Sequence, residues 1–204
     1  MSGFIEMFSF GNEDDDSESP QEPHRPRWFG PPDDELGVVC PQAIILARSE
    51  NAVIALSHAT VYSTGIAFDF LAQARGLTRS QASRLFHEQH TFEEEDLPDA
   101  FLRIGFEFGD GRRVSNLGGW RGHSKLMQDN AEPEGPLLIP YAGGGGNSNG
   151  GNVTMKPGYW LWPLPPSGPL RISCEWPLVR IAVTTVQIDA PLLENAQHVT
   201  RLWP

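Results

Sequence analysis

The chain has 204 residues, including 21 glycines and 18 prolines, and a formal net charge of −11. This length suits one well-filled domain with tails, and the frequent Gly and Pro favour many short strands over long helices. No run approaches the roughly 18 apolar residues of a membrane-spanning helix. The first residues lack the basic start and continuous apolar core of a secretory signal. We therefore expect a cytoplasmic protein that does not enter membranes.

The negative charge is concentrated near the N-terminus. Residues 1–36 contain ten acids and two arginines, a net charge of −8, whereas the remaining 168 residues contain 16 acids and 13 bases, a net charge of −3. Phosphate binding needs a cluster or stripe of basic side chains that releases counterions, and the sequence has none. We therefore expect no nucleic-acid partner.

Residues 1–36 are predicted to form an acidic, largely extended N-terminal arm. The stretch Asp14–Glu22 is charged, rich in Ser and poor in β-branched residues, so it cannot bury enough surface to order itself. Five bulky apolar residues precede it. They either fold back on the domain or form a short linear motif that inserts into a partner. They are Phe4, Ile5, Met7, Phe8 and Phe10.

The end of this arm contains an aromatic pair followed by prolines. Trp28 and Phe29 are expected to dock on the body of the domain, while Pro31 and Pro32 fix the direction of the chain. These two aromatic residues complete the predicted interaction residues of the arm.

Residues 37–204 are predicted to form one β domain that begins with a three-stranded meander. The runs 42–48, 52–62 and 66–72 are apolar or alternating and are separated by turn residues. Strict alternation in the second run has a simple consequence for its two faces. It places Val53, Ala55, Ser57, Ala59 and Val61 opposite Ile54, Leu56, His58, Thr60 and Tyr62.

The middle of the domain contains one helix signal, one hairpin signal and one glycine run. Thr78 or Ser80 could cap a short helix that ends near Gln89. Asp110-Gly111 between two strand-like runs predicts a β-hairpin. The glycine-rich stretch 141–152 has neither the lysine nor the following helix of a phosphate-binding loop, so we expect a flexible loop there.

The segment 158–177 is expected to organise the fold. It contains two predicted strands, Tyr159–Leu164 and Leu170–Trp176, joined by a proline-stiffened turn as a hairpin between two layers. We expect its indole rings, and that of Trp203, to pack inside. These elements predict an all-β fold, a two-sheet β-sandwich of the jelly-roll or immunoglobulin-like kind with one or two short helices.

The cysteines and histidines do not indicate a metal site. Cys40 and Cys174 lie far apart, without ligand spacing, and are expected to be buried free thiols. His87 and His90 have a spacing that suits two ligands on one helix, but no third ligand is placed beside them. We expect no metal and no cofactor.

The function predicted from these patterns is non-catalytic: a protein-interaction or scaffold module that binds a protein partner or self-associates as an oligomer. A first alternative is a carbohydrate-binding sandwich, because Trp160 and Trp162 lie two apart in a strand, near Glu175 in the sequence. A second alternative is a hydrolase with paired carboxylates, Glu107 and Glu175, which requires carboxyl groups within about 10 Å of each other. No catalytic residue is assigned.

Several segments resemble a family of uncharacterised actinobacterial proteins with a Trp-Pro-rich C-terminal segment. The likeness is carried by residues 27–39, 44–70 and 103–116, by the Trp-Pro segment YWLWPLPPSGPL with CEWP, and by the terminal LWP. The resemblance implies no activity, cofactor or catalytic residue, so it transfers no functional position to this chain.

Overall fold

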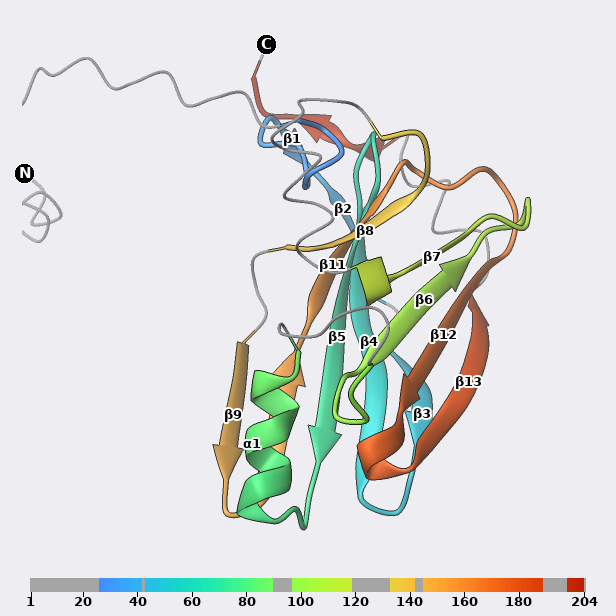
Figure 1. Cartoon of the computed structure of the whole chain (residues 1–204). Helices are drawn as coiled ribbons and strands as arrows, with labels where there is room; N and C mark the ends of the chain where they lie inside the picture. The colour runs from blue at the N-terminus through green and yellow to red at the C-terminus, as the bar shows by residue number, and fades with distance from the viewer. Residues whose placement is uncertain are drawn as a thin grey trace, which may run out of the picture.

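The computed structural model describes residues 26–41, 43–89, 97–118, 133–141, 145–188 and 198–203. These residues are mostly β, which confirms the predicted all-β, sandwich-like fold (Figure 1). Two antiparallel sheets form the layers, and a two-stranded ribbon lies at one end. The ribbon pairs β1 (Glu35–Leu36) with β14 (Thr200–Arg201).

The larger sheet is built on two long central strands, β4 (Ala52–Val61) and β5 (Ile66–Ala74). Each central strand is flanked on its other side by two shorter strands placed end to end. Two further strands form the outer edge on the β5 side of the sheet. Pro157 divides one such pair, and its carbonyl still accepts a hydrogen bond from the Phe70 amide at 2.9 Å. The flanking strands are β2 (Val38–Cys40), β3 (Ile44–Arg48), β10 (Asn152–Lys156) and β11 (Gly158–Trp162), with β8 (Leu137–Pro140) and β9 (Gly145–Asn149) outermost.

The smaller sheet has the order β13-β12-β6-β7. The predicted hairpin joins β6 to β7, and Gly111 in its turn has a φ of 85°, a left-handed conformation that glycine adopts without strain. Short 3-10 turns, η2 (Asn116–Gly118) and η3 (Pro177–Val179), follow two of the strands. The strands are β6 (Arg103–Glu107), β7 (Arg113–Ser115), β12 (Leu170–Trp176) and β13 (Ile181–Ile188).

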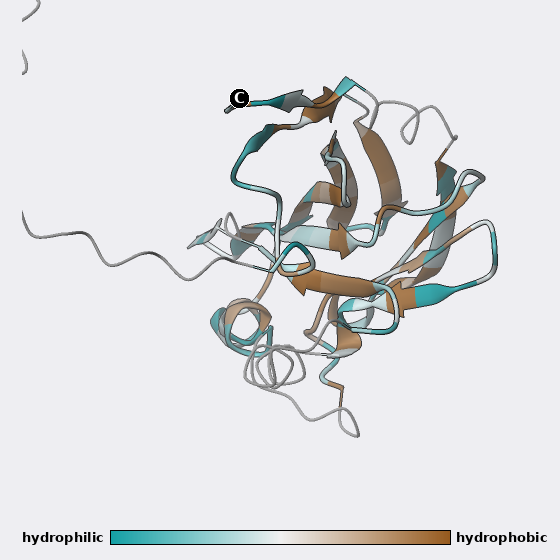
Figure 2. Ribbon diagram, turned by 90° about the horizontal axis from the view of Figure 1, so that it is seen from above, coloured by the Kyte–Doolittle hydropathy of each residue, from teal (hydrophilic) through white to brown (hydrophobic). Residues whose placement is uncertain are grey.

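The main core lies between the two sheets, where hydrophobic segments face one another (Figure 2). The rings of Phe68 on β5 and Phe106 on β6 have centroids 4.7 Å apart and join the layers directly. The buried Asn116 adds a polar connection. Its side chain donates to the Leu102 carbonyl at 2.8 Å and to the Tyr159 hydroxyl at 2.9 Å, so both layers share its amide.

A β-bulge in β4 corrects the predicted alternation. The register shifts between Leu56 and His58, so Ala59 and Val61 point into the same core as Ile54. Strict alternation would have placed His58 there instead. An extra residue in one strand re-aims every later side chain, which a pattern of period two does not anticipate.

A second hydrophobic cluster, here called the indole cluster, lies on the other face of the larger sheet. It consists of Trp28, Ala67, Ile139 and Trp160, with Phe29, Tyr62 and Trp162 packed around it. The predicted docking of Trp28 and Phe29 on the body is confirmed. Residues 26–36, assigned to the arm from sequence, thus include segments that pack and pair with the domain.

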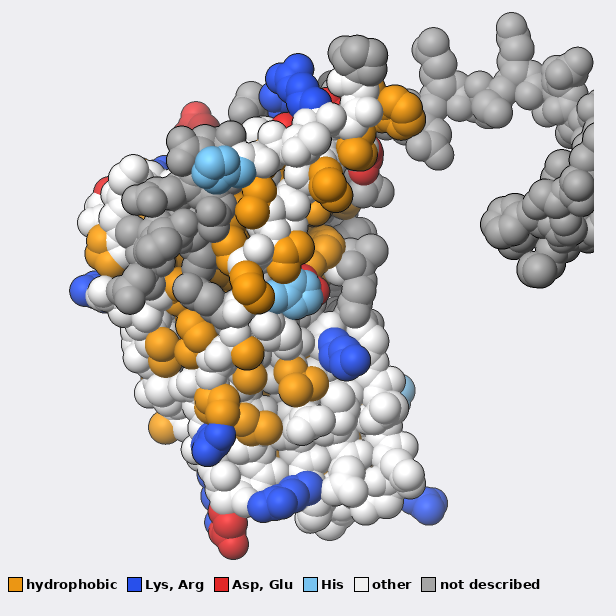
Figure 3. All heavy atoms as spheres, turned by 180° about the vertical axis from the view of Figure 1, so that it is seen from behind, with side chains coloured by type: hydrophobic (Ala, Val, Ile, Leu, Met, Phe, Trp, Pro, Cys, Tyr) orange, Lys and Arg blue, Asp and Glu red, His pale blue; other side chains and the backbone are white. Residues whose placement is uncertain are grey.

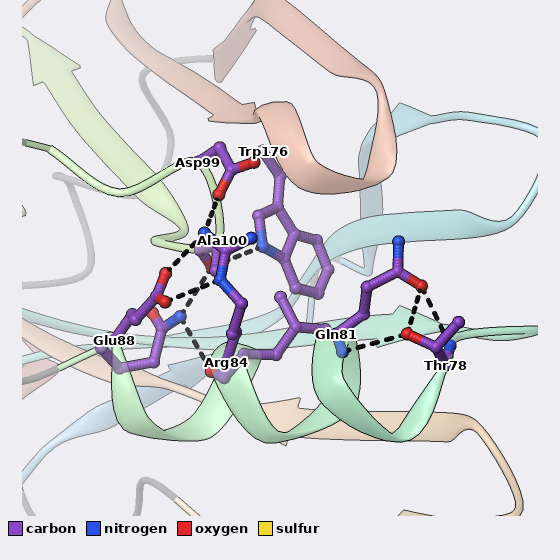
Figure 4. Close-up of polar contacts among 9 residues, drawn as sticks. Thr78, Gln81, Arg84, Glu88, Asp99, Ala100 and Trp176 are labelled. Carbon is purple, nitrogen blue, oxygen red and sulfur yellow. Dashed lines mark hydrogen bonds and ion pairs between the residues drawn. The ribbon is translucent and has the colours of Figure 1, made fainter.

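The helix α1 (Arg79–His87) was predicted correctly, with Thr78 as its cap in a reciprocal capping box with Gln81 (Figure 4). Its buried residues, Ala82 and Leu85, belong to the main core. The Gln89 side chain donates to the Ala100 carbonyl at 2.9 Å, and that carbonyl also accepts from Trp176 Nε1 at 2.9 Å. These bonds connect the segment after the helix to the smaller sheet.

Three sequence predictions for the C-terminal part of the chain were wrong. Residues 145–149 form β9 rather than a flexible loop, because the glycine backbone pairs with β10 and leaves room for the Phe86 ring, 2.5 Å from a Cβ built on Gly146. The strands β11 and β12 do not form a hairpin, since the chain between them crosses from the larger sheet to the smaller. Trp203 is 72 % exposed instead of packed.

The two fully buried indoles differ in hydrogen bonding, which gives a stability prediction. Trp176 Nε1 has an acceptor, whereas Trp160 Nε1 has none among the described residues. We expect Trp176→Phe to lower the free energy of unfolding by about 1–2 kcal/mol more than Trp160→Phe, because only the first substitution removes a hydrogen bond. Urea unfolding of both variants measures this difference. Equal losses, or a larger loss for Trp160→Phe, would contradict it.

Candidate binding face of the larger sheet

A row of polar groups crosses the outer face of the larger sheet, the face turned away from the main core. His58 on β4 lies opposite Asp69 on β5, and Asp69 lies opposite Gly158 on β11. Asp69 Oδ2 is 3.2 Å from His58 Nε2 and accepts a hydrogen bond from the Tyr141 hydroxyl at 2.6 Å. We call His58, Asp69, Gly158 and Tyr141 the polar row.

Local sequence explains why these groups meet. The turn Tyr62–Gly65 closes the β4–β5 hairpin, and the Tyr62 amide donates to the Gly65 carbonyl at 2.9 Å. Counting back from this turn pairs residue 58 with residue 69, so the hairpin itself contained the signal that sequence reasoning missed. Gly158 has a separate role, because a Cβ there would lie 2.9 Å from Tyr141 Cε1. Only a residue without a side chain leaves the Tyr141 ring in place.

Burial and charge affect the two tyrosines near Asp69. Burial, followed by the hydrogen bond to Asp69, raises the pKa of Tyr141 above its usual value. Burial also raises the pKa of Tyr62, with smaller contributions from Asp69 and Glu35. In both cases the surroundings disfavour the phenolate, so these hydroxyls remain donors at neutral pH.

The polar row lacks the other parts of a catalytic or metal site. Among the described residues, the polar contact of His58 is with Asp69 and not with a hydroxyl or thiol nucleophile, and Cys40 of the neighbouring strand belongs to the main core. Within the described ranges no group of three or more His, Cys, Asp or Glu side chains could hold a metal ion. The row therefore supplies a fixed carboxylate and an imidazole beside the apolar side chains of this face.

Beside the polar row lies a row of aliphatic side chains. Ile45 on β3 is opposite Ala55 on β4, and Ala55 is opposite Leu71 on β5. Ile45 is 48 % exposed, and Ala55 and Leu71 are partly exposed. We call Ile45, Ala55 and Leu71 the aliphatic row. An aliphatic row is unexpected on the solvent side of an antiparallel sheet, where alternating strands usually place polar residues.

Basic side chains border the aliphatic row on two sides. Arg48 and Arg75 are exposed toward the end of the sheet at which β5 ends, and Lys156 is exposed on β10 beside the row. The acids near them are Glu50 and the already paired Asp69. Figure 3 looks onto this face and shows hydrophobic side chains over its middle with lysine or arginine side chains below them. The face therefore combines apolar surface with positive charge.

A shallow depression of about 410 Å³ lies at this end of the face. Arg48 and Arg75 line it together with Val53, Gln73 and Thr154. The Gln73 amide donates to the Thr154 hydroxyl at 3.4 Å, so part of the floor is polar. Glu50 lines it as well, so this concave surface has two positive side chains and one negative side chain.

The structure separates the residues of the carbohydrate alternative. Trp160 is fully buried in the indole cluster, and Trp162 is partly buried at its margin. Glu175 lies on the smaller sheet, where its carboxylate is 2.5 Å from Arg103 Nη1. Trp160 thus has no open ring face for a sugar, and Glu175 belongs to the opposite layer of the sandwich.

The hydrolase alternative requires the carboxylates of Glu107 and Glu175 to lie close together, and the structure places them apart. Glu107 pairs with Arg171, whereas Glu175 lies four residues further along β12 opposite Arg103. Four residues of strand separate the two backbone positions by about 13 Å. Glu107 is held by Arg171 and Arg113, whose hydrogen bonds lower its pKa. The carboxylates are therefore separate ion pairs rather than an acid/base pair.

The remaining predicted residues are placed as follows. The arm residues Phe4, Ile5, Met7, Phe8 and Phe10 lie outside the described residues, as does His90. Cys40 and Cys174 are both buried, as predicted, with no disulfide between them, and burial raises the pKa of Cys174 to about 11. A thiol with this pKa is protonated and unreactive at neutral pH.

Comparisons with known proteins add no relative to this description. The chain matches no protein-family model, no curated protein and no solved structure. Within the part of the chain that the structure describes, no helix is long and apolar enough to cross a membrane.

The close approach of Tyr141 to Gly158 gives a second prediction. Gly158→Ala should lower the free energy of unfolding by about 1–3 kcal/mol, because the new methyl group would overlap the Tyr141 ring. Gly135→Ala is the matched control, since nothing lies within 4 Å of its Cβ position. Chemical unfolding of both variants tests this, and equal stabilities would show that Tyr141 does not lie over Gly158.

A third prediction concerns alkaline pH. All three tyrosines of the chain have a pKa raised above 10.0, with burial as the largest cause. The folded protein therefore keeps phenol protons that the unfolded chain loses, and its stability should fall as the pH rises above 10. Tyrosinate absorbance should show native titration midpoints above those in denaturant. A tyrosine with its normal midpoint in the native protein would contradict this.

Proposed function

We propose that this protein is a non-catalytic protein-binding module and that its contact surface is the outer face of the larger sheet. The observation that carries the proposal is the exposed aliphatic row, Ile45, Ala55 and Leu71, aligned across three neighbouring strands. Exposed apolar patches rimmed by polar residues are typical of protein-interaction sites. Val39, 58 % exposed on β2 opposite Thr60, lies beyond the polar row on the side of the indole cluster and is not part of this surface.

The chemistry of the face defines the kind of partner it would bind. The aliphatic row would contact apolar side chains of the partner, and Arg48, Arg75 and Lys156 would attract carboxylates next to them. A partner segment with bulky apolar residues beside an acidic run fits both requirements. The polar row bounds the surface on its other side and supplies hydrogen-bonding groups that orient such a segment.

The indole cluster supports this role indirectly. Trp28 covers Trp160 and Ala67, so the part of the outer face next to β2 and β8 already has its apolar cover. The aliphatic row has no comparable cover among the described residues. The outer face is therefore covered at the indole cluster, whereas no described residue gives the aliphatic row a similar cover.

A fourth prediction tests the proposed surface. Ile45→Asp and Leu71→Asp should weaken binding of the partner without unfolding the protein, because each places a carboxylate in the apolar contact. Val183→Asp is the matched control, since Val183 is 68 % exposed on β13 of the other sheet. Partners would be captured with the wild-type chain, purified, and titrated calorimetrically against all four proteins.

We expect Val183→Asp to bind as the wild type does, and the two aliphatic-row variants to bind at least about tenfold more weakly, a loss of 1.4 kcal/mol. Circular dichroism and thermal unfolding would verify that each variant is folded. Partner binding that survives both Ile45→Asp and Leu71→Asp would exclude this face.

A further inference from the structure

We infer that the N-terminal segment of this chain, Phe4–Phe10 with the acids that follow it, docks in cis on the aliphatic row and masks it. The inference rests on the proposed binding face and names its resident occupant. It makes this segment an internal competitor that a partner of similar chemistry must displace.

The composition of the N-terminal segment complements that of the face. The segment contains five bulky apolar residues within seven positions, and Glu13, Asp14, Asp15 and Asp16 follow shortly after it. The face offers the matching pair of features, because its aliphatic row lies beside the basic side chains of Arg48, Arg75 and Lys156. Apolar contact and charge attraction can therefore be satisfied together by one extended segment.

The described residues that follow this segment lie beside the surface that it would cover. Residues 26–29 lie on the same outer face, where Trp28 packs with Ala67 in the indole cluster. Ala67 and Leu71 are four residues apart on β5, so the aliphatic row begins about 13 Å further along that strand. The segment is thus tethered beside the surface that it would cover.

The tether is long enough to reach the face. Residues 17–25 join the acids to the anchored turn, and nine residues can span at most about 30 Å. This reach exceeds the separation required. Because the tether keeps the segment near the face, its effective concentration is of the order of millimolar, which favours docking in cis over docking on a second molecule in dilute solution.

The test uses the full chain with labelled Ile, Leu and Val methyl groups. The arm variant combines Phe4→Ser, Ile5→Ser, Phe8→Ser and Phe10→Ser, and the control variant combines Leu202→Ser with Trp203→Ser, two exposed residues at the ribbon end. We expect the methyl resonances of Ile45, Val53 and Leu71 to move in the arm variant and not in the control. The Val183 resonance should stay unchanged in both.

A synthetic peptide of residues 1–20 is then added to each protein. It should return the moved resonances of the arm variant toward their wild-type positions and bind that variant about tenfold more tightly than the wild type, where the tethered segment competes. Leu71→Asp in the arm variant should abolish peptide binding, and high salt should weaken it by screening the acids.

Two results would overturn the inference. Unchanged Ile45 and Leu71 resonances in the arm variant would show that the segment does not contact the face. Wild-type resonances that move on dilution would show that the occupant is the segment of a second molecule. In either case the calorimetric comparison of Ile45→Asp with Val183→Asp still decides the proposed function separately.

Discussion

The register between β4 and β5 is the constraint on which the rest of the structure depends. The bulge between Leu56 and His58 lets Ala59 and Val61 continue the core side of β4, opposite a β5 strand that alternates without interruption. The same extra residue turns His58 outward, opposite Asp69. One irregularity therefore completes the hydrophobic core and creates the polar row on the opposite surface.

This register also places apolar side chains on both faces of the larger sheet, and these have different covers. The inner face is covered by the smaller sheet, with Phe68 against Phe106. The outer face is covered near Trp160 by Trp28, while the aliphatic row carries only partial cover. A sheet that is apolar on both sides needs a second layer on each, and the proposed partner and the N-terminal segment are two ways to supply it.

The sequence predicted the elements whose signals are local. The meander, helix α1 and the Asp110-Gly111 hairpin follow from alternation, capping and turn chemistry that neighbouring residues contain. The bulge was not predictable, because Ser57 is polar and its insertion leaves no mark in the pattern. The strand β9 was missed because its glycines have no side chains to alternate, and its pairing with β10 is a backbone property.

The candidate site was largely hidden from the sequence for a related reason. Trp160 and Glu175 were selected by residue type, yet they lie in different layers, because the chain crosses between sheets after β11. The aliphatic row consists of ordinary strand residues that look like core until pairing shows which face they occupy. Trp28 and Phe29 were the exception, since two adjacent aromatic residues before prolines indicate an anchored turn without reference to the fold.

The most direct test of this account is the β4–β5 register, measured by cross-strand nuclear Overhauser contacts between α-protons in the full chain. The bulged register pairs Leu56 with Phe70 and Ala59 with Phe68, and it is the result that we predict. A register that continued unbroken from the Leu56–Phe70 pair would instead pair Ser57 with Asp69 and Ala59 with Ala67. That result would return His58 to the core side, separate it from Asp69, and remove the basis for the outer face described above.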